Sequence, residues 1–173
     1  EKMEFFLKNI AEDEWNAEQD RGRSLKDGTD IQVAKFPEWE MEIRAYYDNW
    51  TTMLRSDIPE NVAVLRKLEH SEYDLFGLTN WSAETFPYAL ENYDFFEIFK
   101  GKIVVSGTEK LIKPDPKIWE VLLERYHLKA EESVFIDDNP KNIEVAKMLG
   151  FITVHITEGT NLAEELRSLG IRF

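Results

Sequence analysis

The chain has 173 residues, 43% of them hydrophobic and 13% aromatic, which is enough apolar material for a folded core and excludes a disordered chain. Its 34 acidic and 21 basic residues give a net charge of −13, which argues against nucleic acid or an anionic membrane as a partner. Cysteine is absent, which excludes disulfides and thiolate metal sites and fits a cytoplasmic location.

The first third of the chain has the apolar spacing of helices and no strand alternation. This spacing predicts helices over residues 3–10, 13–24, 29–35, 37–54 and 59–68, with prolines at the first positions of the last two. We expect a helical cap over residues 1–58. We interpret Trp15, Trp39 and Trp50 as core aromatics. The alternative is that they form an aromatic ligand-binding site. The polar segment 18–23 is interpreted as a solvated helix face, with a substrate-facing segment as the alternative.

From Tyr73 onward, strand patterns and helix patterns alternate. Strands are predicted at residues 73–79, 102–106, 134–137 and 151–156, and a helix follows each of them. Asp115 is the predicted cap of the second of these helices, and Pro116 takes its first position. Four alternations predict an α/β fold, with a doubly wound, Rossmann-like parallel sheet over residues 59–173 that is covered on both faces.

Two adjacent acids, Asp137 and Asp138, end the most apolar of these strands, just before the helix that Asn139 caps. In open α/β sheets, ligands bind at the carboxyl ends of the strands. Carboxylates this close repel each other, and a bound Mg²⁺ would remove that repulsion with the hard oxygen ligands it prefers. Taken alone, such a pair favours the simpler explanation, that both acids are solvated capping residues.

Polar side chains also follow the two preceding strands. Thr79 and Asn80 come after the first strand, and Lys113 lies in the loop after the second. Each has an ordinary explanation, as turn chemistry or as a surface lysine. Together, at three successive strand ends, a hydroxyl, an amide, a cation and two carboxylates predict a site for phosphate and a metal ion.

These residues form three motifs, which are Leu78-Thr79-Asn80-Trp81-Ser82, Lys113-Pro114-Asp115-Pro116, and Phe135-Ile136-Asp137-Asp138 with Asn142. The set resembles the haloacid dehalogenase (HAD) superfamily over the whole chain. The segment from residue 16 to residue 23 is also similar to the cap of the branch that includes sugar-phosphate and other small-phosphate phosphatases. The resemblance therefore implies a hydrolase of small phosphorylated metabolites that works through an aspartyl-phosphate.

The resemblance also implies roles for individual residues. Thr79 and Asn80 would bind phosphate, and Lys113 would stabilise the nucleophile and the phosphate. Asp138 would bind Mg²⁺ directly and Asp137 would support it. Asn142 would lie behind these two acids without contacting the metal. Family members that dehalogenate 2-halo acids work without metal and usually lack two acids here, so the pair favours a Mg²⁺-dependent phosphatase.

One motif of the family is absent from the sequence. The resemblance calls for an Asp-x-Asp at the end of a central strand that precedes the cap, where the first Asp is the nucleophile and the second the general acid and base. No Asp-x-Asp occurs here, and Glu1 already falls in a helical pattern. We therefore expect a truncated or incomplete chain that lacks on the order of 20–40 residues, including the central strand. Such a chain should be inactive, and its open sheet position should cost stability or invite strand swapping or aggregation.

Two other interpretations stay open. The chain could be a non-catalytic fragment that binds a phosphorylated ligand or a partner protein, or it could be a metal-free 2-haloacid dehalogenase. His70, His127 and His155 have no metal-binding spacing and are interpreted as structural or surface residues. The sequence leaves the phosphate ester and the oligomeric state open.

Overall fold

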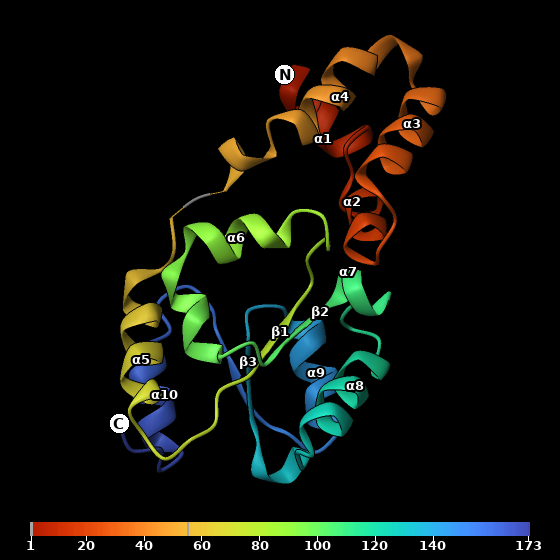
Figure 1. Cartoon of the computed structure of the whole chain (residues 1–173). Helices are drawn as coiled ribbons and strands as arrows, with labels where there is room; N and C mark the ends of the chain where they lie inside the picture. The colour runs from red at the N-terminus through yellow and green to blue at the C-terminus, as the bar shows by residue number, and fades with distance from the viewer. Residues whose placement is uncertain (1, 55) are drawn as a thin grey trace. The chain divides into compact units, whose positions relative to one another are not determined.

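The computed structural model describes residues 2–54 and 56–173, which form two compact units (Figure 1). The helical unit comprises the chain up to Ser56 together with residues 80–87 and 105–112. The sheet unit comprises residues 57–79, 88–104 and 113–173. The expectation that the helical pattern includes Glu1 concerns a residue outside the described ones.

The helical unit is built around aromatic side chains. Its elements are α1 (Lys2–Asn9), α2 (Asp13–Asp20), α3 (Leu25–Lys35), η1 (Pro37–Trp39), α4 (Glu40–Asp48), η2 (Trp50–Met53) and α7 (Ser106–Glu109). Its buried core consists of Phe6, Ile10, Ala11, Trp15 and Ile43, with Trp39, Tyr46 and Tyr47 among the side chains packed against it. The interpretation of Trp15 and Trp39 as core aromatics is thus confirmed.

Helix α3 begins earlier than predicted because Ser24 caps it. The Ser24 hydroxyl accepts a hydrogen bond from the Asp27 backbone N–H at 3.0 Å, so the helix starts at Leu25 and not at Thr29. Within α3, Gly28 lies so close to Gln19 of α2 that an added Cβ would come within 2.5 Å of the Gln19 Oε1 atom. Glycine at this position therefore permits the close approach of α2 and α3.

The prediction of a single helix over residues 37–54 was wrong, because the helix is interrupted at Asn49. The Asn49 side chain donates to the Ala45 carbonyl at 3.0 Å, and the Asn49 carbonyl accepts from the Thr52 hydroxyl at 2.7 Å. Such local bonds compete with helical backbone bonds. Helix α4 consequently ends at Asp48, and a 3₁₀ turn carries Trp50.

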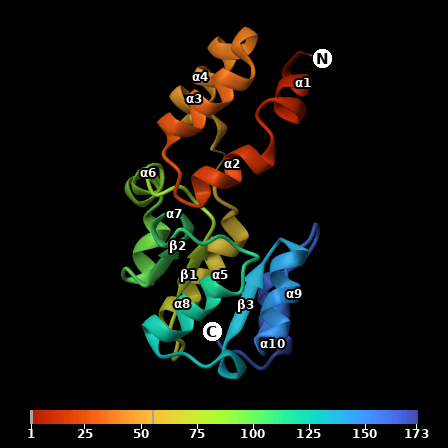
Figure 2. The same cartoon turned by 90° about the vertical axis from the view of Figure 1, so that its right-hand side faces the viewer.

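The sheet unit alternates strands and helices as predicted. Its elements are α5 (Pro59–Glu69), β1 (Gly77–Thr79), α6 (Phe86–Asn92, whose first two residues belong to the helical unit), η3 (Asp94–Phe99), β2 (Ile103–Val105, whose last residue belongs to the helical unit), α8 (Lys117–Tyr126), η4 (Ala130–Glu132), β3 (Val134–Asp137), α9 (Pro140–Met148), β4 (Ile152–His155) and α10 (Leu162–Ser168). Strands β3 and β4 pair in parallel, with α9 beside β3 (Figure 2), and β1 pairs with β2. Side chains of α5, β4 and α10 share one core. None of the described helices has both the length and the apolar character to cross a membrane.

The four described strands form two separate pairs, and an apolar groove lies between them. The groove has a volume of about 630 Å³ and is lined by Leu75, Phe76 and Leu78 on the β1 side and by residues 134–136 on the β3 side. Only residues 77–79 of the predicted strand 73–79 form a strand, since their partner β2 spans only residues 103–105 and the described chain places no strand on the groove side of Leu75 and Phe76. The parallel α/β architecture is therefore present, with a central position open between β1 and β3.

Candidate active site

The acid pair lies at the carboxyl end of β3, where the sequence predicted it. The Asp137 side chain is 6% exposed and accepts three hydrogen bonds, from Lys113 Nζ at 2.7 Å, the Asn139 backbone N–H at 2.8 Å and Asn142 Nδ2 at 3.0 Å. Asp138 is exposed, and within the described chain its carboxylate has no hydrogen-bond or ion-pair partner. The two neighbours therefore differ, because Asp137 is held by the protein and Asp138 is available to a ligand.

Lys113 joins the ends of two strands. Its ammonium donates to the Leu78 carbonyl of β1 at 2.9 Å and to the Asp137 carboxylate of β3 at 2.7 Å, and its side chain is only 9% exposed. Thr79 follows Leu78 directly, so its backbone lies next to the carbonyl that Lys113 contacts at this edge of the sheet unit. Asn80 follows Thr79 directly in the chain but belongs to the helical unit.

Asn142 and His155 complete the surroundings of the acids. Asn142 on α9 is 4% exposed, and its Oδ1 atom has no hydrogen-bond partner among the described residues, while its Nδ2 donates to Asp137. His155 pairs with Asp137 in the register of β3 and β4, and its Nε2 contacts the Asp138 carbonyl at 3.0 Å. This backbone contact agrees with the structural interpretation of His155.

The donor set suits Mg²⁺ with one or two protein ligands. Among residues 2–54 and 56–173 no cluster of three or more Asp, Glu, His or Cys side chains could hold a metal. Mg²⁺, however, commonly binds through one or two carboxylates and takes its remaining oxygens from water and substrate phosphate. The unpaired Asp138 carboxylate fits the direct ligand, and Asp137, already bonded to Lys113 and Asn142, fits a supporting role.

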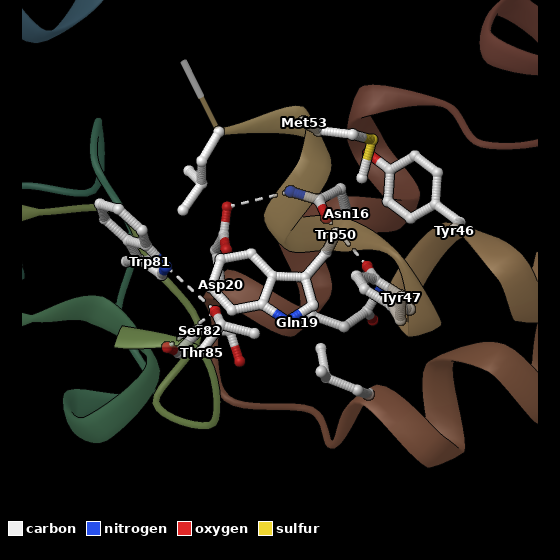
Figure 3. A pocket seen from close by; sticks show the side chains of 12 residues that line it. Asn16, Gln19, Asp20, Tyr46, Tyr47, Trp50, Met53, Trp81, Ser82 and Thr85 are labelled. Carbon is white, nitrogen blue, oxygen red and sulfur yellow. Dashed lines mark hydrogen bonds between the residues drawn. The ribbon is translucent and has the colours of Figure 1, made fainter. Parts of the chain in front are cut away.

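A second hollow lies within the helical unit and is lined by Asp20, Trp50 and Trp81, among other residues (Figure 3). Burial raises the pKa of the Asp20 carboxyl to about 6, although a hydrogen bond from the Ser82 backbone N–H acts in the opposite direction. Arg23 does not neutralise this acid, because its guanidinium donates to Gln19 and to the Trp15 carbonyl. Asp20 is therefore a partly buried acid that no described base pairs with.

Comparison with known proteins shows the family and the fold of the chain. The family model described as haloacid dehalogenase-like hydrolase matches residues 9–156. The chain belongs to the haloacid dehalogenase-like hydrolases. Its fold is also that of the family, since a HAD family enzyme from Bacteroides thetaiotaomicron, crystallised with magnesium, superimposes with a TM-score of 0.76 at 22% identity over 96% of this chain and 86% of that one. Another crystal structure of that enzyme, with a TM-score of 0.70 at 23% identity over 87% of this chain and 78% of that one, contains magnesium and inorganic phosphate.

Two curated relatives are named as phosphatases. A sesquiterpene phosphatase from Aspergillus oryzae is 30% identical over 74% of this chain and 64% of its own length. A phosphoglycolate phosphatase from Vibrio cholerae is 26% identical over 80% of this chain and 68% of its own length. The chain thus spans about two thirds of the length of these relatives.

Sequence reasoning found the acid pair and Lys113 but missed the hollow in the helical unit. The segment 18–23 was interpreted as a solvated face, whereas Gln19 is fully buried and Asp20 lines the hollow. Likewise, Trp50 was assigned to the core and instead lines the hollow. The available signal was the position of Trp81 and Ser82, two and three residues after Thr79, which places aromatic and polar groups next in the chain to a predicted phosphate ligand.

Proposed function

We propose that this hydrolase of the HAD family provides the magnesium- and phosphate-binding side of a phosphatase active site that acts on small phosphorylated metabolites. The observation that carries the proposal is the Lys113 ammonium, bonded to the ends of both β1 and β3 beside the unpaired Asp138 carboxylate. The absence of cysteine supports the cytoplasm as the proposed location.

Each residue of the group has a proposed task. The Thr79 hydroxyl and the Asn80 amide donate hydrogen bonds to phosphate oxygens, and the Lys113 ammonium offsets the charge that develops on the transferring group. Asp138 would hold Mg²⁺, and Asn142 with Lys113 fixes the orientation of the neighbouring Asp137 carboxylate. A bound Mg²⁺ would supply further positive charge to the phosphate oxygens.

The nucleophile is the part that these 173 residues do not provide. Phosphoryl transfer to an aspartate followed by hydrolysis is the proposed reaction, and the sequence has no Asp-x-Asp. The apolar groove between β1 and β3 supports this proposal, because a strand that carries the nucleophilic Asp would fit between these two strands. We therefore propose that the 173-residue chain binds Mg²⁺ and phosphate without hydrolysing phosphate esters.

The relatives support the phosphate and leave the rest of the substrate open. Both relatives are named phosphatases, one of a sesquiterpene and one of phosphoglycolate. The two names have the phosphoryl group in common and differ in the leaving group. The proposal accordingly commits to phosphoryl chemistry at the sheet edge.

Calorimetric titration with Mg²⁺, with and without inorganic phosphate, tests the proposal. Asp138→Asn should weaken Mg²⁺ binding about tenfold or more, because one charged ligand is lost. Glu144→Gln, an exposed acid on α9, is the matched control and should leave it unchanged. Equal Mg²⁺ affinity in both variants would contradict the site, and hydrolysis of p-nitrophenyl phosphate by the 173-residue chain would contradict the proposed lack of turnover.

A further inference from the structure

His155 is the last residue of β4 and lies beside the acid pair. In the parallel register of β3 and β4 it is the partner of Asp137. Side chains alternate along a strand, and the preceding Val154 is buried in the core that β4 shares with α5 and α10. The His155 side chain therefore points to the opposite face of the sheet unit, where Asn142 of α9 donates to Asp137.

A side chain continues the pairing of β3 and β4 where their backbone ladder stops. The Ile156 N–H donates to the Asp137 carbonyl at 3.0 Å, at the carboxyl end of this ladder. The next carbonyl along β3, that of Asp138, contacts His155 Nε2 at 3.0 Å. Both carbonyls of the acid pair are therefore bonded to the end of β4, one by its backbone and one by a side chain.

The chemistry of the second contact decides which group donates. A carbonyl oxygen only accepts hydrogen bonds, so the His155 Nε2 atom carries the hydrogen. In a neutral ring this is the Nε2–H tautomer, which leaves Nδ1 as an acceptor. The contact thus predicts one tautomer of His155 and makes this side chain a donor to the main chain of Asp138.

The turn that contains Asp138 is otherwise held by bonds between near neighbours. The Asn139 N–H donates to the Asp137 carboxylate at 2.8 Å, and the Lys141 N–H donates to the Asn139 side chain at 2.9 Å. These bonds shape the turn, but they attach no part of it to another strand. The His155 contact differs from them, because it joins Asp138 itself to β4.

We propose that His155 is a positioning residue for Mg²⁺, because it holds the main chain of the metal ligand Asp138 against β4. The inference rests on the proposed function, in which the exposed Asp138 carboxylate binds the ion. Bonds that orient a ligand add to metal affinity even though they do not reach the metal. Since water can compete for this exposed bond, we expect its loss to weaken Mg²⁺ binding by about threefold.

The alternative is that His155 only fills space at the end of β4, and two substitutions separate these roles. Glutamine carries its amide nitrogen the same number of bonds from Cβ as the histidine Nε2, so His155→Gln keeps a donor for the Asp138 carbonyl. His155→Met has a side chain of similar size without a donor. A positioning role therefore requires Gln to restore what Met loses, whereas a space-filling role does not.

NMR spectroscopy of the 173-residue chain tests the bond without any metal. Long-range ¹H–¹⁵N correlation at about pH 8, where an ordinary histidine ring is neutral, identifies the tautomer of His155. We expect the Nε2–H tautomer. The Nδ1–H tautomer would overturn the proposal, because Nε2 could then not donate to the Asp138 carbonyl. This outcome does not depend on the proposed function.

Calorimetric titration with Mg²⁺ then tests the positioning role. His155→Met should bind Mg²⁺ about threefold more weakly than the unmodified chain, and His155→Gln should bind it nearly as well. His70→Met, at an exposed histidine that follows α5, is the matched control and should leave the affinity unchanged. Unchanged affinity in His155→Met, or equal weakening in His155→Met and His155→Gln, would overturn the role of His155. Absence of Mg²⁺ binding by the unmodified chain would instead overturn the proposed function.

Discussion

At the level of single residues, the Lys113–Asp137 ion pair is buried, so each partner depends on the other. Both side chains are less than a tenth exposed, at 9% and 6%. Taking two charges out of water is costly, and attraction between them offsets that cost only while both are present. The pair is therefore weak support for stability as a whole but a strong constraint on either residue alone.

A double-mutant cycle measures this constraint. Lys113→Met leaves the Asp137 carboxylate buried without its cation, and we expect it to lower the free energy of unfolding by about 3–5 kcal/mol. Adding Asp137→Asn removes the stranded charge, and the double variant should regain most of the loss. Urea unfolding of the two single variants and the double variant supplies the cycle. Additive losses would show that the two side chains are not coupled.

Asp20 predicts a pH dependence of the opposite sense from most acids. Its pKa is raised from 3.8 to about 6 in the folded protein, so the folded state holds the proton more tightly than the unfolded state. Its contribution is favourable below pH 4 and is lost as the pH rises through 6. Asp20→Asn should therefore gain stability relative to the unmodified chain above pH 6, on the order of 1 kcal/mol after discounting for partial exposure.

Urea unfolding between pH 4 and pH 8 checks this sign, with Glu14→Gln as the exposed control whose difference from the unmodified chain should stay flat. A constant difference for Asp20→Asn across the range would show that the carboxyl is not perturbed.

At the level of elements, the open edges of β1 and β3 predict that a strand can be added. Adjacent strands lie about 4.8 Å apart, and unpaired edges with apolar neighbours readily accept an extended segment. A synthetic peptide of about six β-branched residues, ending in Asp-x-Asp, should bind the groove. We expect it to raise the thermal midpoint of the 173-residue chain and to confer Mg²⁺-dependent hydrolysis of p-nitrophenyl phosphate.

A peptide with Asn in place of the first Asp is the matched control for this experiment. It should raise the thermal midpoint equally, since the backbone pairing and apolar contacts are the same, but it should confer no hydrolysis. If neither peptide changes the thermal midpoint, the groove does not accept a strand. If both confer hydrolysis, the first Asp is not the nucleophile.

At the level of the whole molecule, the charge of −13 affects how the metal experiments are done. An acidic surface attracts Mg²⁺ diffusely, and this background adds to any specific binding. At about 0.15 M salt, charges more than about 8 Å apart are largely screened, so titrations at that ionic strength isolate Asp138 from the general field. The comparison of Asp138→Asn with Glu144→Gln, which removes the same charge elsewhere, cancels the remainder.

Along the whole chain, local signals predicted most elements and failed where a distant partner decided the outcome. The cap of α9 by Asn139 and the start of α5 at Pro59 follow from residues next to them, and both were predicted. The strand predicted at residues 73–79 spans only 77–79, because its partner β2, distant in the chain, spans only residues 103–105. One miss was local: helix α3 begins at Leu25, four residues before the predicted start at Thr29, because Ser24 caps it.

Residue type and short spacing were enough to predict the α/β alternation, the acid pair at a strand end and the motif set that identifies the family. The folded chain was needed to show that Lys113 bonds to both β1 and β3, that Asp137 is held while Asp138 has no partner among the described residues, and that Asp20 and Trp50 line a hollow. The reason is that burial and hydrogen-bond partnership depend on segments far apart in the chain, whose approach no local pattern encodes.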